Sequence, residues 1–317
     1  MLDQSVRAVE VIVSDNASTD DTASVVASFG DERVHYVRNE ANIGATANIS
    51  RGLELGSAPF LMILCDDDFL LPGSLERRIP LFESDPMIDM VHCALRFQVF
   101  APDGSLVGEV DSAWGAGSRD TVSSGSEVVR RLLSEPFFIS HANALIRRSA
   151  IGDVRALDAD GAAEDLGMFL RLAYRARNVA YVPEPLVCAR VHGAANSVEG
   201  RTTFTGDSYE PTILSAVQNR QVKERFLDEL ERNGADIRTL RSASRALDRR
   251  VLQSLLHRTL TAAGGRSLRP IVDVGRVDPI ALIAPRGIKA IAAGALGPGR
   301  YDRAKTALSS LRARFET

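Results

Sequence analysis

Four short apolar runs recur through the first hundred residues, and helical patterns separate them. The runs are rich in branched residues and are typical of buried strands: Val9–Val13, Val34–Val37, Phe60–Leu64 and Ile88–Ala94. Three stretches between them carry apolar residues at helical spacing: Ala23–Phe29, Ala45–Leu55 and Leu75–Phe82. Because strand and helix alternate, the pattern predicts an α/β fold whose sheet is mostly parallel, with helices on both faces.

The pattern changes beyond residue 95. Asp103-Gly104 between apolar runs predicts a hairpin, and the Gly- and Ser-rich segment Gly115–Ser126 is typical of a mobile loop. From residue 205 the strand signal fades and helical patterns dominate. The elements predicted in this half are a helix at Glu164–Ala176, extended segments at Ala180–Val182 and Leu186–Val191, and helices at Ile213–Asn233 and Ile237–Ala262.

The net charge of −3 conceals an uneven distribution. Residues 201–317 carry 21 Lys and Arg against 12 Asp and Glu, whereas residues 1–200 carry 17 against 29. A basic C-terminal third fits contact with an anionic partner such as a membrane surface, and a solvated helical surface explains it equally well. The apolar stretch 278–296 suits either the membrane interface or two short packed helices. Basic segments without interleaved aromatic residues argue against nucleic-acid binding.

Cysteine content and hydropathy favour a cytoplasmic protein. The three cysteines, at positions 65, 93 and 188, are too few for a disulfide framework and fit a reducing compartment. The N-terminus lacks the apolar core of a secretory signal, and no stretch reaches the roughly 18 apolar residues of a spanning helix. We therefore expect a cytoplasmic location, with the basic C-terminal third as the part that would contact the inner face of a membrane.

Three consecutive acids, Asp66, Asp67 and Asp68, form the sharpest candidate site. They directly follow an apolar strand, and adjacent carboxylates repel one another. Mg²⁺ or Mn²⁺ would offset this repulsion, because hard cations bind carboxylates together with substrate phosphates. The alternative is an acidic helix N-terminus stabilised by the helix dipole. The position between a strand and a Pro-opened helix favours the metal site.

Further candidate residues lie at the ends of predicted elements. Asp15 ends the first strand, so in a parallel sheet it should face the same crevice as the three acids; alone it also suits an Asx turn. Glu164 and Asp165 open a helix, where a carboxylate suits a general base or a cap. His192 suits a metal or diphosphate ligand, or a surface position. A P-loop, G-x-G-x-x-G and G-x-S-x-G are absent from the sequence.

Four segments, taken in order, resemble inverting glycosyltransferases of family 2 with the GT-A fold: VEVIVSDNASTDDT, NEANIGATANISRGLELGSAPFLMILCDDDFLLPGSLE, AAEDLGMFLRLA and LVCARVHGAANS. The resemblance covers about residues 5–200. It implies a nucleotide-sugar-binding part at residues 1–110 and an acceptor-binding part at residues 111–204. Residues 205–317 would form a helical, basic C-terminal region.

The resemblance also implies roles for individual residues. Those that match the segments around the nucleotide sugar are Asp15, Asn16, Asn42, Gly44, Arg51, Asp66 and Asp67. Those that match the metal site are Asp66, Asp68 as the direct ligand, and His192. Asp165 matches the catalytic base, with Glu164 beside it.

The implied enzyme is a hexosyltransferase of polysaccharide biosynthesis at the cell envelope. It would use Mg²⁺ or Mn²⁺ and move a sugar from a UDP- or dTDP-sugar to a hydroxyl of a glycan or lipid-linked acceptor. A single displacement would invert the anomeric configuration.

One segment departs from the family pattern. Family members begin with an apolar strand and a helix, whereas this sequence starts within what matches the end of that helix, Leu2-Asp3-Gln4-Ser5. The expectation is therefore a sheet that lacks its first strand beside the nucleotide site. The alternatives are a truncated GT-A domain that binds without catalysis or has no function, a sugar-1-phosphate nucleotidylyltransferase, and a haloacid-type phosphatase. The Gly-rich N-terminal loop that the second alternative requires is missing, and the residues around Asp66 fit the third poorly.

Overall fold

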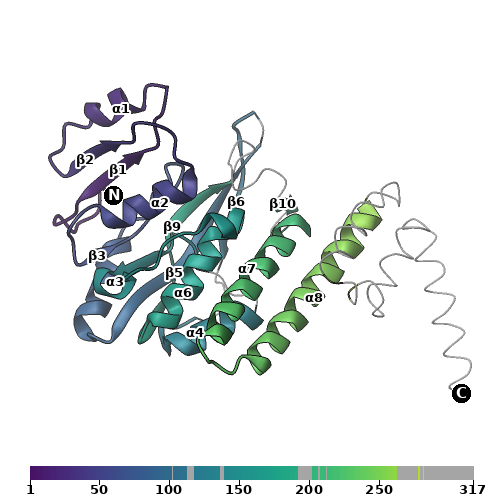
Figure 1. The fold of residues 1–317 in the computed structure, drawn as a ribbon. Coiled ribbons are helices and arrows are strands. Elements are labelled where there is room, and N and C mark those ends of the chain that lie inside the picture. The colour runs from purple at the N-terminus through teal and green to yellow at the C-terminus, as the bar shows by residue number, and fades with distance from the viewer. Residues whose placement is uncertain are drawn as a thin grey trace, which may run out of the picture.

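A seven-stranded sheet lies at the centre of the computed structural model, which describes residues 1–101, 103–112, 118–135, 139–191, 202–205, 208–211, 213–262, 278 and 281 (Figure 1). The strands follow the order β3-β8-β5-β9-β4, with β6 paired to β5 and β7 paired to β9. Their bounds are β3 Phe60–Leu61, β4 Phe69–Leu70, β5 Ile88–Phe100, β6 Leu106–Ser112, β7 Thr121–Ser124, β8 Ala144–Arg147 and β9 Asn178–Val191. β5 and β9 are parallel, and the other pairs are antiparallel.

A separate two-stranded sheet carries the N-terminal part of the chain. β1 (Val11–Asp15) and β2 (Val34–Arg38) are parallel, and their register places Asp15 beside Arg38 at the strand ends. Helix α1 (Thr22–Ser28) makes the crossover between them, since parallel neighbours cannot be joined by a tight turn. Helix α2 (Ala45–Glu54) follows β2. A further antiparallel pair consists of β10 (Thr202–Thr205) and β11 (Ser208–Pro211).

Helices cover both faces of the central sheet. Successive strand residues point to opposite faces, so each face of the sheet can carry its own core. One face packs on α3 (Ser74–Ser84), and the other packs on α4 (Gly125–Ser134), α6 (Glu164–Arg175) and α7 (Ile213–Arg232). Phe169 and Phe226 are almost fully buried in the second core, and burying a side chain of this size contributes roughly 1.5–3 kcal/mol. Helix α8 (Arg238–Ala262) packs on α4 and α7. The short elements α5 (Arg148–Ile151) and η1 (Asp158–Ala163) precede α6.

The α/β class is confirmed, but the sheet is mixed rather than mostly parallel. The predicted hairpin at Asp103-Gly104 is present: the amide of Ala101 donates to the carbonyl of Ser105 at 2.8 Å, and β5 and β6 are antiparallel. A short connection of this kind reverses the chain, whereas parallel neighbours need a crossover of about a dozen residues. Single-strand patterns carry no information on which neighbour each strand takes.

Several element bounds differ from the prediction. The apolar run at 60–64 is a strand only at Phe60–Leu61, because the chain leaves the ladder before turning at Asp66-Asp67. Strand β7 lies inside the segment predicted as a loop, of which residues 115–117 are outside the described part. The two extended segments after residue 180 form one strand, β9, in which Pro183 and Pro185 lie where the register shifts. Proline has no N–H to donate to a strand ladder, so it is tolerated at such an irregularity.

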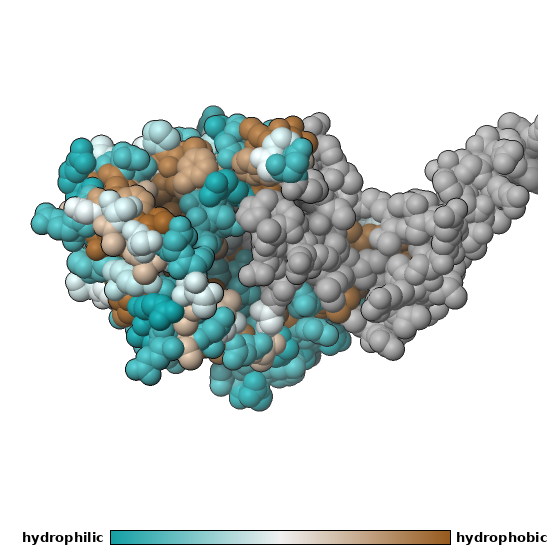
Figure 2. Space-filling model, turned by 90° about the horizontal axis from the view of Figure 1, so that it is seen from above, coloured by the Kyte–Doolittle hydropathy of each residue, from teal (hydrophilic) through white to brown (hydrophobic). Residues whose placement is uncertain are grey.

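None of the helices that the structure describes is both long and apolar enough to cross a membrane. On the face shown in Figure 2, apolar residues lie in separate patches among hydrophilic ones. Of the apolar stretch 278–296, only Asp278 and Ala281 are described. Asp278 is buried and forms ion pairs with Arg220 at 2.7 Å and Arg249 at 3.0 Å. This point of the stretch is therefore held against α7 and α8.

Candidate active site

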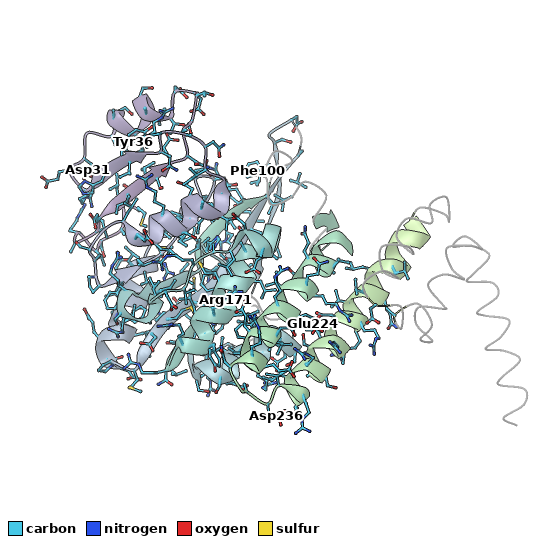
Figure 3. The ribbon with its side chains drawn as sticks, viewed as in Figure 1. Asp31, Tyr36, Phe100, Arg171, Glu224 and Asp236 are labelled. Atoms are coloured by element: carbon cyan, nitrogen blue, oxygen red, sulfur yellow. The ribbon has the colours of Figure 1, made fainter. Side chains whose placement is uncertain are left out.

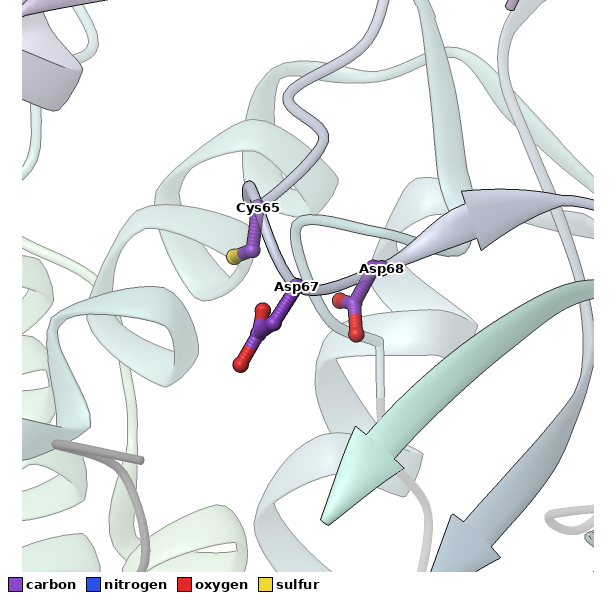
Figure 4. Close-up of side chains that lie close together, drawn as sticks. All are labelled: Cys65, Asp67 and Asp68. Atoms are coloured by element: carbon purple, nitrogen blue, oxygen red, sulfur yellow. The ribbon is translucent and has the colours of Figure 1, made fainter. Parts of the chain in front are cut away.

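A turn after β3 brings a thiol and two carboxylates together. The ligand atoms of Cys65, Asp67 and Asp68 all lie within 4.8 Å of one another, and Figure 4 shows the three side chains gathered at the turn. Asp66 is exposed and lies outside this group. The structure therefore joins Asp67 and Asp68 among the three predicted acids, and the assignment of Asp66 as a metal ligand stays a prediction.

Arg190 on β9 holds this turn in place. The pairing of Phe69 with Cys188 brings the end of β9 beside the turn. The backbone amide of Arg190 donates to Asp68 Oδ1 at 3.0 Å, and its guanidinium Nε donates to the carbonyl of Asp67. Burial raises the pKa of Asp68 to about 6, although the Arg190 hydrogen bond opposes the shift. The carboxylate is thus crowded, partly desolvated and close to a second acid.

The donor set of the turn fits a hard divalent cation through its carboxylates. Desolvation, followed by the carboxylates of Asp68, Asp67 and Asp66, raises the pKa of the Cys65 thiol to about 12. A thiol that keeps its proton is a poor ligand. Two neighbouring carboxylates are the oxygen ligands that Mg²⁺ and Mn²⁺ take, usually together with phosphate oxygens of a substrate.

Asp165 lies within electrostatic range of the same turn. It opens α6, where its Oδ1 accepts a hydrogen bond from the amide of Leu166 at 2.7 Å. The inner face of α6 is fully buried, which fixes the helix and hence the position of its first turn. The carboxylate of Asp165 contributes to the raised pKa of Cys65, so the two side chains are within electrostatic range. Glu164 precedes it and is also partly buried.

Asp15 is already surrounded by donors. Ser18 N donates to its Oδ1 at 2.9 Å. The hydroxyl of Tyr36 on β2, which is labelled in Figure 3, donates to Oδ2, and Arg38 Nε lies 3.3 Å from the same oxygen. The hydrogen bonds from Ser18 and then from Tyr36 lower the pKa of Asp15 to about 2. A contact of Asp15 with a nucleobase, as the family resemblance implies, stays a prediction. In the structure its carboxylate closes the turn over residues 15–18.

Asparagine side chains join the loops that follow β1 and β2. The amide of Asn39, which is buried, donates to Asn16 Oδ1 at 3.0 Å and to Asn48 Oδ1 at 2.9 Å. Asn16 in turn donates to Asn42 Oδ1 at 2.9 Å. Asn48 donates to the carbonyl of Ser14 at 2.9 Å. Two of the predicted residues, Asn16 and Asn42, therefore belong to one network.

The same network fixes Gly44 and Arg51. The amide of Gly44 donates to Asn42 Oδ1 at 2.9 Å, and the Arg51 guanidinium donates to Asn39 Oδ1. Gly44 precedes α2 with φ +86°, a conformation that glycine adopts without strain. Four of the seven residues predicted around the nucleotide sugar, Asn16, Asn42, Gly44 and Arg51, are thus joined in one network beside the small sheet, while the acid turn belongs to the large sheet.

His192, predicted near the metal, lies outside the described residues. Sequence reasoning missed four residues that shape the site: Cys65, Arg190, Tyr36 and Asn39. The pairing of β1 with β2 would have pointed to Tyr36, because parallel neighbours bring their ends together. Arg190 lies in the segment LVCARVHGAANS, but its backbone role at Asp68 has no sequence signature.

Comparisons with known proteins find glycosyltransferases that are similar to part of this chain. Residues 1–155 match the family model described as Glycosyl transferase family 2. The succinoglycan biosynthesis protein ExoU of Rhizobium meliloti is 32% identical over 147 residues, which make up 43% of this chain and 43% of that protein. The GalNAc(5)-diNAcBac-PP-undecaprenol beta-1,3-glucosyltransferase of Campylobacter jejuni is 41% identical over 75 residues, 23% of this chain and 24% of that protein. The matched segments thus span less than half of either relative.

A solved structure supports the fold. The crystal structure of S. aureus TarS 1-349 in complex with UDP has a TM-score of 0.51 at 12% sequence identity, and the match covers 90% of this chain and 80% of that chain. At this identity the similarity shows the fold alone. It confirms the GT-A class that the sequence predicted.

Proposed function

We propose that this chain, whose residues 1–155 match the family model described as Glycosyl transferase family 2, transfers a sugar from a nucleoside diphosphate sugar to a hydroxyl of a glycan or lipid-linked acceptor. The observation that carries the proposal is the grouping of Asp67 and Asp68 with Cys65 at one turn, within electrostatic range of Asp165 through the Cys65 thiol. A metal-assisted single displacement uses two carboxylates to hold the cation. It uses a separate carboxylate as the base.

Asp67 and Asp68 would hold Mg²⁺ or Mn²⁺, with Asp66 and His192 as further predicted ligands. When bound, a divalent cation offsets the negative charge that develops on the departing nucleoside diphosphate. Arg190 keeps the turn in position through its backbone amide.

Asp165 would accept the proton of the attacking hydroxyl, with Glu164 beside it. As the proton moves to the carboxylate, the acceptor oxygen forms a bond to the anomeric carbon from the face opposite the leaving group. The bond from that carbon to the diphosphate oxygen breaks in the same displacement, so the configuration inverts. The first turn of a buried helix suits this role, because a base must be held in a fixed geometry.

The small sheet would bind the nucleotide. Asn16, Asn42, Gly44 and Arg51 present amide and guanidinium groups on one surface, and Asp15 fixes the loop beside them. We propose a UDP- or dTDP-sugar as donor. The Campylobacter jejuni relative is named for action on an undecaprenyl-diphosphate-linked glycan. A lipid-linked acceptor would bring the enzyme to the inner face of a membrane, through its basic C-terminal region.

A thermal-shift screen of nucleotide sugars with and without Mn²⁺ tests this proposal. We expect at least one UDP- or dTDP-sugar to raise the melting temperature only when Mn²⁺ is present. Asp68→Asn should abolish that shift, because the amide keeps the hydrogen bond from Arg190 and removes the charge. Asp153→Asn is the matched control, because Asp153 is an exposed acid that pairs with Arg175 at the last residue of α6, and it should retain the shift. An undiminished shift in Asp68→Asn would show that the metal assignment is wrong.

A further inference from the structure

A buried histidine, His141, lies at the same end of the β3–β8 strand pair as the acid turn. His141 is 8% exposed, and its ring packs against Phe169 of α6 with the ring centroids 5.9 Å apart. Its Nε2 is buried and has no hydrogen-bond partner in the part of the chain that the structure describes. The side chain is therefore an incompletely satisfied polar group inside the protein.

Strand register brings His141 toward the acid turn. Leu61 of β3 pairs with Ile146 of β8, and the two strands are antiparallel. Cys65 follows Leu61 by four residues, and His141 precedes Ile146 by five. Because the strands are antiparallel, both residues lie beyond the same end of this strand pair. Helix α6 leads to the same place, since Asp165 lies four residues before Phe169 and therefore on the same helix face.

The chemistry of the imidazole selects the kind of ligand it would bind. Burial lowers the pKa of His141 to about 4, so the ring is neutral near pH 7. A neutral ring offers one donor and one acceptor, which matches a hydroxyl group. A diphosphate would instead call for a cation. A buried polar atom left without a partner costs stability, and such atoms in native structures call for an explanation.

We propose that His141 is a sugar-binding residue of this site, and that its Nε2 forms a hydrogen bond with a hydroxyl of the donor or acceptor sugar beside Asp165. The assignment rests on the proposed function. Protein atoms cover Nε2 in this structure, so the proposed hydrogen bond requires the ring to turn when the sugar binds.

Replacing His141 by phenylalanine separates this role from packing. In His141→Phe an apolar ring of similar shape faces Phe169, and the unsatisfied nitrogen is gone. We expect the melting temperature to stay unchanged or rise. Titration calorimetry with Mn²⁺ present should show UDP binding as in the wild type and UDP-glucose binding weaker by about tenfold, the weight of one hydrogen bond. His141→Gln, which retains a polar group, should recover part of the loss.

The kinetics of the same variant test whether the hydroxyl bound by His141 belongs to the acceptor sugar. If the hydroxyl belongs to the acceptor, UDP-glucose binding stays unchanged and the KM for the acceptor rises about tenfold. His92→Phe is the matched control, because His92 is also buried on this sheet but packs against Tyr181. It should leave both readouts unchanged.

Unchanged UDP-glucose affinity together with an unchanged acceptor KM in a folded His141→Phe protein would overturn the assignment. Equal losses of UDP and UDP-glucose binding would also overturn it, because they indicate a general disturbance. A wild-type protein that binds no UDP- or dTDP-sugar in the presence of Mn²⁺ would instead overturn the proposed function, and this assignment with it.

Discussion

A buried ion pair joins helix α8 to helix α7, which packs on the sheet. Removing one member of the pair should lower the free energy of unfolding. Lys223 of α7 lies 2.8 Å from Asp248 of α8, and both side chains are less than 10% exposed. The Lys223 ammonium also reaches the carbonyl of Leu133 on α4 at 3.5 Å. Glu224, the next residue on α7, is labelled in Figure 3. The perturbation we consider is Lys223→Met, which keeps the length of the side chain and removes its charge.

The expected loss follows from the burial of the partner that remains. Asp248 keeps one carboxylate oxygen without any hydrogen-bond partner in the described structure even when Lys223 is present. Removing one member of a buried pair costs about 3–5 kcal/mol, because the other charge is left buried and uncompensated. For a protein of this size that corresponds to a fall in melting temperature on the order of 10 °C.

The double variant Lys223→Met, Asp248→Leu distinguishes charge from packing. It removes both charges and fills the space with apolar atoms, so its stability should return to within about 1 kcal/mol of the wild type. Denaturant unfolding of the wild type, Lys223→Met and the double variant measures all three free energies of unfolding.

The pH dependence provides a second signature. Burial raises the pKa of Asp248 even beside Lys223, and loss of the cation raises it further. An acid whose pKa is higher in the folded state than in the unfolded state favours folding as the pH falls, because the folded state binds the proton more tightly. The Lys223→Met penalty should therefore shrink from about pH 8 to about pH 5. A single variant as stable as the wild type, or a double variant no better than the single, would refute this account of the pair.

Three further substitutions test other parts of the structure. Ala17 has φ +63°, so Ala17→Gly should raise the free energy of unfolding by roughly 0.5–1 kcal/mol; an unchanged denaturant midpoint would show that the turn is unstrained. A Cβ on Gly167 would lie 2.0 Å from Oδ2 of the buried, ion-paired Asp160, so Gly167→Ala should destabilise by about 3 kcal/mol, and calorimetry showing no loss would contradict the geometry. Asp15 has a pKa lowered to about 2 from 3.8, so its stabilising effect is complete above the unfolded value and is lost as the pH falls toward 2. Tyr36→Phe removes one of its hydrogen bonds, so acid unfolding should begin at higher pH, and an acid midpoint equal to the wild type would argue against that bond.

The sequence predicted most helices and strands well because their apolar periodicity is local. Residues 45–54 and 164–175 form helices within one residue of the predicted ends. Strand partners were harder, since the pairing of β5 with β9 joins residues about ninety positions apart. β4 and β7 were missed because they are short strands held by β9, and no local pattern announces such strands.

The acids of the candidate site were visible in the sequence, but their surroundings were not. A run of three Asp after an apolar strand indicated a cation site, yet the turn exposes Asp66 and groups Asp67 and Asp68 with Cys65. Which side chain of a turn faces inward depends on backbone dihedral angles that residue types alone do not fix. The electrostatic proximity of Asp165 depends on how α6 packs, which is a property of the assembled core.

The central claim is that Asp165 removes a proton from an acceptor hydroxyl while a cation at the acid turn holds the donor. The most direct measurement is the release of UDP from UDP-glucose by the wild type and by Asp165→Asn, with Mn²⁺ present and with EDTA added. Water serves as the acceptor when no glycan is supplied. We expect the wild type to release UDP only with Mn²⁺, and Asp165→Asn to bind UDP-glucose normally while release falls by about a hundredfold or more. Release by Asp165→Asn at the wild-type rate, or release that persists in EDTA, would contradict the account.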